Sequence, residues 1–294
     1  MGSAFEAFLT IQCIMTIAAL GHYLPLSMKQ LDVGIAGYMA IGAYASAILT
    51  RDFGLAFPLA IAAGTIAAAA AALVVDILAA RVRLSGFTYA IFALSFAESL
   101  RIILNNSDRV GGTLGFVGIR HHTTLTGVAV VLAIVILGFW ALDRSRLGHL
   151  RTAIRDDAFI VPQLGVPLLA TKLVIFAIGG GLGGMAGGLY AHYVLFIRPD
   201  DFGFLLLVAI MLPIVFGGLD RFYGAILGTW ILGIIPELFR GLGEYRLLLT
   251  AAATILLLVL RPGGLITDGT IERAKGLFRS RDAHRRDATD TGRP

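Results

Sequence analysis

Nine long runs of apolar residues constrain the fold of this 294-residue chain more than any other feature. A helix needs about 20 apolar residues to cross a bilayer, with a range of roughly 17–25. The runs cover 5–26, 33–50, 55–79, 84–104, 125–142, 168–194, 204–218, 223–240 and 246–261. The runs at 33–50 and 204–218 are short and contain glycine, so we expect either to be only partly inserted or broken. The pattern predicts an all-α, polytopic membrane protein with about nine transmembrane or partly inserted helices.

The composition argues against other classes of protein. The chain is 57% hydrophobic and only 15% charged, whereas soluble domains carry about 25% charged residues. The net charge of +5 raises the question of nucleic acid. The basic residues, however, lie between apolar runs and in the tail, so we expect no nucleic-acid binding. The lone Cys13 allows no disulfide framework. The first run lacks a basic flank and holds Glu6, so we interpret it as a retained helix rather than a signal peptide.

The loop lysines and arginines predict the orientation, because such residues are enriched in cytoplasmic loops. If residues 148–166 are cytoplasmic, the cytoplasmic side receives a basic tail and Lys29, Arg81, Arg83, Arg144, Arg146, Arg151, Arg155, Lys172, Arg221 and Arg261. The outer side receives Arg51, Arg109, Arg120, Arg198, Arg240 and Arg246. An odd number of spans then places the N-terminus outside and the C-terminus in the cytoplasm. We divide the chain into a transmembrane domain, 1–266, and a basic cytoplasmic tail, 267–294, which is solvated or binds anionic lipid.

One charged segment interrupts the apolar pattern: "GHLRTAIRDDAFIVPQLGV", residues 148–166, within a cytoplasmic stretch at 143–167. We expect Gly148 to end the preceding structure. A short amphipathic helix should follow from Arg151 to Ile160, parallel to the membrane surface, with its charges pointing outwards. Pro162 disfavours helix at the residue before it and marks a boundary. Two roles are open for this helix: an interfacial helix, or a docking element for a soluble partner.

A few ionisable residues lie within the apolar runs, where a charge is by default a candidate for function. Glu98 and Arg101 are spaced i, i+3 and therefore lie side by side on a helix, either as a structural ion pair or in a pathway or gate. We expect Asp76 to pair with Arg81 or Arg83 at the membrane interface.

Glycines are concentrated in two places. In the outer loop at 105–122, backbone amides near Gly111, Gly112, Gly115 and Gly118 could meet a carboxylate, or the loop is simply flexible. In the run at 168–194, glycines recur every four residues in two adjacent rows, which favours close helix packing over a helix that bends or slides.

Sequence motifs for nucleotide binding or catalysis are absent. The nearest approach to a phosphate-binding loop is "GTLGFVGI", residues 112–119, which has Gly118 and Ile119 where Lys and Ser or Thr are required. The sequence holds no HExxH, CxxC or GxSxG. We therefore expect no enzyme activity, metal or cofactor on this chain, and no ATP hydrolysis by it.

Seven stretches, in order and spacing, resemble the permease subunits of branched-chain amino acid ATP-binding cassette (ABC) transporters, especially the LivM-like half of the pair. They are "GIAGYMAIGAYASAIL" (34–49), "RLSGFTYAIFALSFAESLR" (83–101), "GGTLGFVGI" (111–119), "LRTAIRDDAFIVPQLGV" (150–166), "KLVIFAIGGGLGGMAGGLYAHY" (172–193), "RPDDFGFLLLVAIMLPIVFGGLDRFYGAILG" (198–228) and "RPGGLI" (261–266).

The resemblance implies one half of a translocation pathway for branched-chain or other hydrophobic amino acids in a bacterial plasma (inner) membrane. It implies four kinds of partner: a second, homologous permease subunit, two ATPase subunits that carry the ATP, an extracytoplasmic binding protein, and membrane lipid. The implied ATPase-coupling residues are Arg151, Arg155, Asp156, Asp157 and Gly165. The candidate substrate-pathway residues are Gly37, Tyr44, Glu98, Gly111, Gly112 and Gly115.

The sequence also departs from the family pattern. Ile160, Val161 and Pro162 stand where relatives have an alanine-rich stretch and an acidic residue, Leu114 stands near a usual Asn or Asp, and Asp220 and Arg221 replace small residues. The same architecture importing urea, a short amide, a sugar or another small polar solute is therefore an alternative. An alternative of another class is an ion-coupled secondary transporter that uses Glu98 and Asp76. An intramembrane enzyme is the weakest alternative, because no catalytic constellation is visible.

Overall fold

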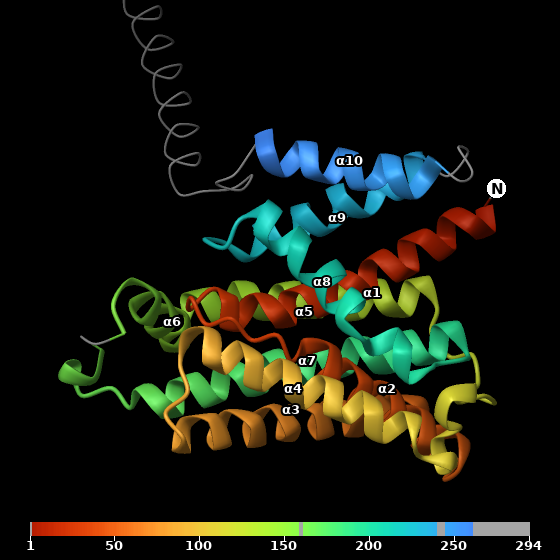
Figure 1. The fold of residues 1–294 in the computed structure, drawn as a ribbon, viewed down its shortest axis with the longest axis horizontal. Helices are drawn as coiled ribbons and strands as arrows, with labels where there is room; N and C mark the ends of the chain where they lie inside the picture. The colour runs from red at the N-terminus through yellow and green to blue at the C-terminus, as the bar shows by residue number, and fades with distance from the viewer. Residues whose placement is uncertain (1, 159–160, 240–244, 261–294) are drawn as a thin grey trace, which may run out of the picture.

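The computed structural model describes residues 2–158, 161–239 and 245–260, and these form a bundle of helices (Figure 1). The α-helices are α1 (Gly2–Leu26), α2 (Ile35–Arg51), α3 (Phe57–Arg81), α4 (Gly86–Asn105), α5 (Leu125–Arg144), α6 (Arg146–Asp156), α7 (Leu168–Val194), α8 (Phe204–Gly217), α9 (Phe222–Leu238) and α10 (Tyr245–Leu260). Four short 3-10 helices join them: η1 (Asp108–Val110), η2 (Gly112–Leu114), η3 (Val161–Leu164) and η4 (Pro199–Phe202). Each predicted apolar run corresponds to one α-helix.

The lengths of these helices confirm an all-α, polytopic membrane protein. Six helical segments of the described chain are long and apolar enough to cross a membrane: α1, α3, α4, α5, α7 and η4 with α8. The run expected to be short at 33–50 forms the regular 17-residue helix α2. The other, at 204–218, forms the 14-residue helix α8 with Pro213 inside it. The predicted tail at 267–294 lies outside the described residues.

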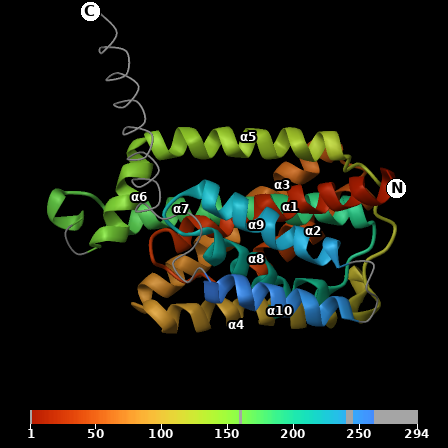
Figure 2. The ribbon, with the colours of Figure 1, turned by 90° about the horizontal axis from the view of Figure 1, so that it is seen from above.

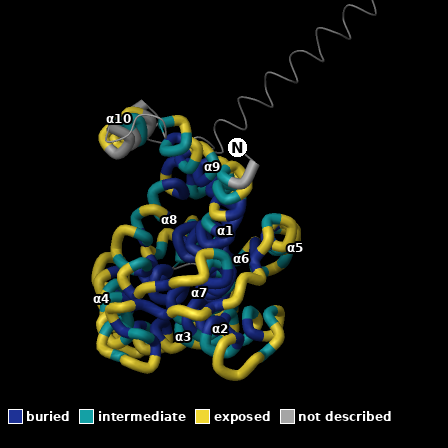
Figure 3. Tube along the Cα trace, turned by 90° about the vertical axis from the view of Figure 1, so that its right-hand side faces the viewer, coloured by how far each residue is buried: buried dark blue, intermediate teal, exposed yellow. Residues whose placement is uncertain are grey.

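Helix α7 lies at the centre of the bundle and packs against α1, α2 and α3. Its two rows of glycine face different neighbours. A methyl group on Gly184 would overlap Ala68 of α3, and one on Gly187 would overlap the Met39 carbonyl of α2. Small residues let helix backbones approach closely, which is how helices associate in lipid. The glycine rows therefore serve packing, as the sequence favoured, and Figure 3 shows α7 among buried residues.

The outer helices expose apolar side chains, as lipid-facing helices do. Helix α5 runs along one edge of the molecule and α4 and α10 along the opposite edge (Figure 2). Val130, Ile134 and Leu137 of α5 are all more than half exposed. A soluble protein would bury such side chains, whereas a bilayer solvates them.

The helices alternate in direction and so divide the connecting segments between two ends of the bundle (Figure 1). One end, which we call the α6 end, holds residues 27–34, 82–85, 145–158, 161–167 and 218–221. The other, which we call the glycine-loop end, holds residues 52–56, 106–124 and 195–203, where Phe116 and Ile197 pair in a single antiparallel bridge. Where the structure describes them, the two groups of basic residues separated by the loop analysis lie at these two ends, whereas Arg240, Arg261 and the tail lie outside the described residues.

Candidate functional site

Helix α6 is the charged helix that the sequence predicted, but it begins and ends earlier. It runs from Arg146 to Asp156, not from Arg151 to Ile160, and Ile160 lies outside the described residues. Ser145 begins the helix because its hydroxyl accepts a hydrogen bond from the Gly148 N–H, 3.4 Å away. The expectation that Gly148 ends the preceding structure was wrong. Gly148 lies inside α6, where a methyl group would overlap the Leu142 carbonyl oxygen at the end of α5.

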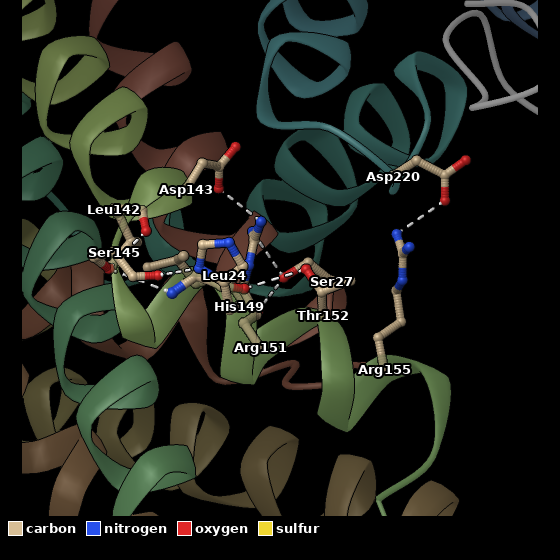
Figure 4. A network of polar contacts seen from close by, with 11 residues as sticks. Leu24, Ser27, Leu142, Asp143, Ser145, His149, Arg151, Thr152, Arg155 and Asp220 are labelled. Carbon is tan, nitrogen blue, oxygen red and sulfur yellow. Dashed lines mark hydrogen bonds and ion pairs between the residues drawn. The ribbon is translucent and has the colours of Figure 1, made fainter. Parts of the chain in front are cut away.

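Arg151 points into the protein, which corrects the expectation that all charges of this helix face outwards. Its side chain is only 7% exposed. One guanidinium nitrogen, Nη2, lies 2.8 Å from Asp143 Oδ1 at the end of α5, and another, Nη1, lies 3.2 Å from Ser27 Oγ after α1. Figure 4 shows both contacts as dashed lines. The guanidinium also lies over the Tyr23 ring, 5.2 Å from its centroid. Arg151 thereby fastens α6 to two transmembrane helices.

Arg155 fastens the other end of α6 to the turn between α8 and α9. Its Nη1 lies 3.1 Å from Asp220 Oδ1 (Figure 4). Both side chains are less than one third exposed, at 21% and 30%. Together with Arg151, Asp143 and Arg221 they line a polar cleft of about 230 Å³. The residue pair that departs from the family pattern, Asp220 and Arg221, thus lies beside the predicted coupling helix.

The opposite face of α6 is exposed to solvent. Arg146, His149, Thr152 and Asp156 are all exposed, while Gly148, Arg151 and Ile154 are buried. Spacings of three and four residues place each set on one side of a helix. Sequence reasoning selected neither His149, which precedes the expected start of the helix at Arg151, nor Thr152, which lies inside the expected range. A helical period counted from the Ser145 cap would have found them.

The remaining predicted coupling residues follow α6. Asp157 is the C-cap of α6 and is exposed. Gly165 has a backbone φ of +77°, which favours glycine, and nothing lies near where its side chain would be. Both therefore lie on the segment that leads from α6 to α7, with η3 between them.

The candidate pathway residues lie away from α6, and several approach the glycine-loop end. Glu98 forms the predicted pair with Arg101, with 2.8 Å between Oε2 and Nε. Arg101 also binds Asp200 of η4, with 2.5 Å between Nη1 and Oδ1, and Asn105 donates to the same Oδ1. Arg101 therefore holds η4 to α4 at the point where the chain enters α8.

The glycine loop is an ordered turn in this structure. Gly111, Gly112 and Gly115 all have positive φ, at +81°, +50° and +88°, which explains their residue type. Gly115 precedes Phe116, whose ring lies 6.1 Å from that of Tyr44. Tyr44 is buried, so its ring contacts the loop from the interior of the bundle. Gly37 is also buried, at the point where α2 packs against Ala97 of α4.

Asp76 does not form the expected ion pair. Among the described residues its partner is Tyr89, whose hydroxyl donates to Oδ1 at 2.5 Å. Asp76 is 7% exposed, and its second oxygen, Oδ2, is buried without a hydrogen-bond partner in the described structure. The expectation of a pair with Arg81 or Arg83 was wrong because this turn of α3 faces α4 and α7 rather than the interface.

Comparisons with known proteins agree with this architecture. The family described as "Branched-chain amino acid transport system / permease component" matches residues 4–260. The high-affinity branched-chain amino acid transport permease LivM of Escherichia coli K12 is 28% identical, over 87% of this chain and 68% of the relative. The autoinducer 2 import system permease LsrC of Enterobacter sp. 638 is 24% identical, over 89% and 77%. LivH of E. coli K12 is 28% identical over 49% of each chain. No solved structure matches the chain.

Proposed function

This chain belongs to the family of branched-chain amino acid transport permeases, and we propose that it forms half of the translocation pathway of an ABC importer. Its proposed substrates are branched-chain or other hydrophobic amino acids. The partners in this proposal are a second permease subunit, two ATPase subunits that bind ATP, and an extracytoplasmic binding protein. The membrane is a bacterial inner membrane.

The observation that carries this proposal is the two-sided character of α6. One face is anchored through Arg151 and Arg155 to three separate parts of the bundle: the end of α5, the segment after α1, and the turn before α9. The other face, with His149, Thr152 and Asp156, is left exposed. A helix that only lay on lipid would present an apolar face outwards. The exposed polar face could bind a soluble protein such as an ATPase subunit. The contacts of Arg151 and Arg155 would then transmit a motion of that subunit to the transmembrane helices as a rigid-body movement.

In this proposal the α6 end faces the cytoplasm and the glycine-loop end faces the binding protein. The larger group of lysines and arginines lies at the α6 end, which is the bias expected of cytoplasmic loops. The N-terminus of α1 is then outside. The ordered glycine loop exposes Leu114 on the outer surface, with 86% of this residue accessible, where a delivering protein would meet it.

ATP-driven uptake tests the proposal directly. The complex is purified with a tagged copy of this chain from its native membranes and placed in liposomes that enclose ATP, and uptake of labelled L-leucine is measured. We expect uptake that requires ATP and the binding protein and that is abolished by Thr152→Arg on the exposed face of α6. Thr152→Ser is the matched control and should leave uptake unchanged, because it keeps the hydroxyl that donates to the Gly148 carbonyl and adds neither bulk nor charge.

Three other outcomes would redirect the proposal. Uptake driven by a proton gradient without ATP would favour the ion-coupled secondary transporter. ATP-driven uptake of urea, a short amide or a sugar, but not of leucine, would keep the architecture and change the substrate. The LsrC relative is a permease of an autoinducer 2 import system, so uptake of other solutes must be compared. Uptake unaffected by Thr152→Arg would remove α6 as the coupling element.

A further inference from the structure

A small cavity of about 230 Å³ lies between α3, α4 and α7, at the α6 end of the bundle. Ligand pockets for drug-sized molecules span about 300–1,000 Å³, so this cavity suits a smaller solute. Its wall contains the apolar side chains Leu84, Leu173 and Phe176 and the charged side chains Asp76, Arg83 and Lys172. The cavity therefore offers both signs of charge beside a hydrocarbon surface.

The carboxylate of Asp76 has capacity left for a ligand. Tyr89 holds Oδ1 in place, while Oδ2 is buried with no hydrogen-bond partner in the described part of the chain. A buried carboxylate oxygen without a partner costs free energy unless something binds it. Lys172 lies close enough for its charge to act on Asp76. Within the described residues, Asp76 and Lys172 form no direct ion pair, so the ammonium nitrogen lies more than 4 Å from the carboxylate oxygens. A ligand could bridge the two residues if it offers a hydrogen-bond donor to Asp76 and an acceptor to Lys172.

The cavity opens towards α6. A second cavity, of about 390 Å³, shares Gln30, Leu84 and Lys172 with the first, so the two adjoin. Ile154, Arg155 and Asp156 of α6 line this second cavity. A solute beside Asp76 therefore lies next to a second cavity that borders the coupling helix.

We propose that this cavity is a binding site for a zwitterionic amino acid with an apolar side chain, on the way out towards α6. The ammonium group binds Asp76 Oδ2, the carboxylate faces Lys172 and Arg83, and the side chain lies against Leu173 and Phe176. Each part of the ligand meets a group that compensates for its loss of water. The inference rests on the proposed function for the direction of transport, but the binding site itself stands on the cavity and its charges.

Thiol protection in the assembled complex tests this site. Ala80 lines the cavity and is half-buried, so Ala80→Cys, in a chain whose native thiol is removed by Cys13→Ala, reports occupancy through its rate of labelling by N-ethylmaleimide. We expect millimolar L-leucine to slow labelling severalfold. Leucinamide, which lacks the carboxylate, and 4-methylpentanoate, which lacks the ammonium group, should not slow it. Ala62→Cys, which lines a different cavity between α3 and α5, should label at the same rate with and without leucine.

The variant Asp76→Asn keeps an acceptor for Tyr89 and should abolish protection by L-leucine, while Asp52→Asn, at the glycine-loop end, should leave it unchanged. No protection in the parent chain, protection retained in Asp76→Asn, or equal protection by all three ligands would overturn the inference. The ligand series needs no Asp76 variant, so it decides the matter even if that variant fails to fold. If L-leucine does not protect Ala80→Cys but ATP-driven uptake is intact, this site alone is refuted. If L-leucine protects but uptake does not depend on ATP, the proposed function alone is refuted.

Discussion

Arg155 Nη1 lies 3.1 Å from Asp220 Oδ1, and this contact joins the candidate coupling helix to the turn that precedes α9. Sequence reasoning had treated Arg155 as a docking residue and Asp220 as a departure from the family pattern. The structure brings the two together. Arg155 therefore belongs to the inner, anchoring face of α6, and the departure at Asp220 supplies its partner.

The first prediction concerns this pair. Asp220→Arg places two arginines together and should reduce ATP-driven uptake, and Arg155→Asp should do the same by placing two carboxylates together. The double variant restores opposite charges and should recover most of the uptake. Because the pair is partly exposed, we expect a coupling free energy of about 1 kcal/mol in thermal unfolding of the same four proteins. A double variant no better than the worse single variant would show that the contact does not carry motion to α9.

The second prediction concerns Arg151, which is more deeply buried. Arg151→Met removes the bonds to Asp143 and Ser27 and leaves Asp143 without its cation. Hydrogen bonds to charged groups contribute about 1.5–3 kcal/mol each, so the loss of both should lower the free energy of unfolding in detergent by about 3–6 kcal/mol. Arg146→Met, on the exposed face, should change it by less than about 0.5 kcal/mol. Equal effects at the two positions would mean that α6 is not anchored through Arg151.

A third prediction reverses the usual rule for glycine in a helix. Replacing a helical glycine by alanine normally stabilises by about 0.5–1 kcal/mol. Gly138 of α5 has open space around it, so Gly138→Ala should follow the rule. Gly148→Ala should instead destabilise by about 1–3 kcal/mol, because the new methyl group would overlap the end of α5. Melting temperatures of the two single variants compare these signs, and stabilisation by both would contradict the close α5–α6 contact.

A fourth prediction concerns pH. Burial raises the pKa of Asp32, in the loop between α1 and α2, from 3.8 to about 6, although the Gly34 N–H donates to its carboxylate and offsets part of the rise. Between these pKa values the folded protein holds a proton that the unfolded chain has lost. Stability should therefore fall as pH rises from about 4 to about 6, by a total of about 3 kcal/mol, and remain level above.

The matched variant for this effect is Asp32→Asn, which keeps the acceptor for Gly34 but has no charge to bury. It should be more stable than the parent at neutral pH, and the difference should vanish below about pH 4. Asp52 provides the contrast, because the hydrogen bond from Arg51 lowers its pKa, so Asp52→Asn should gain no stability at neutral pH. An Asp32→Asn protein with the same pH profile as the parent would contradict this account of Asp32.

The sequence predicted most of the fold because a membrane span leaves a simple signature. All nine apolar runs are helices, and the loop charges separate into the two ends of the bundle. The i, i+3 spacing of Glu98 and Arg101 also predicted their ion pair. These features depend on local spacing and composition, which a sequence displays directly.

What the sequence could not supply depended on contacts between distant segments. The start of α6 depends on the Ser145 cap, and the position of Gly148 on its approach to α5. The partner of Arg155 lies 65 residues away in the chain, and that of Arg151 at Ser27 lies 124 residues away. Asp76 was expected to pair with Arg81 or Arg83 at the interface because it lies near the end of an apolar run. That position in the sequence does not tell which neighbouring helices its side of α3 contacts.

The central claim is that the exposed face of α6 receives an ATPase subunit, and cross-linking tests it most directly. Thr152→Cys, in a chain carrying Cys13→Ala, is labelled in the purified complex with a short reagent that has a thiol-reactive end and a photoreactive end, and the complex is then illuminated. The account predicts a product that contains this chain and the ATPase subunit, whereas Arg120→Cys at the glycine-loop end gives none. Absence of that product from a complex that still transports leucine with ATP, or an equal yield from both positions, would contradict the claim.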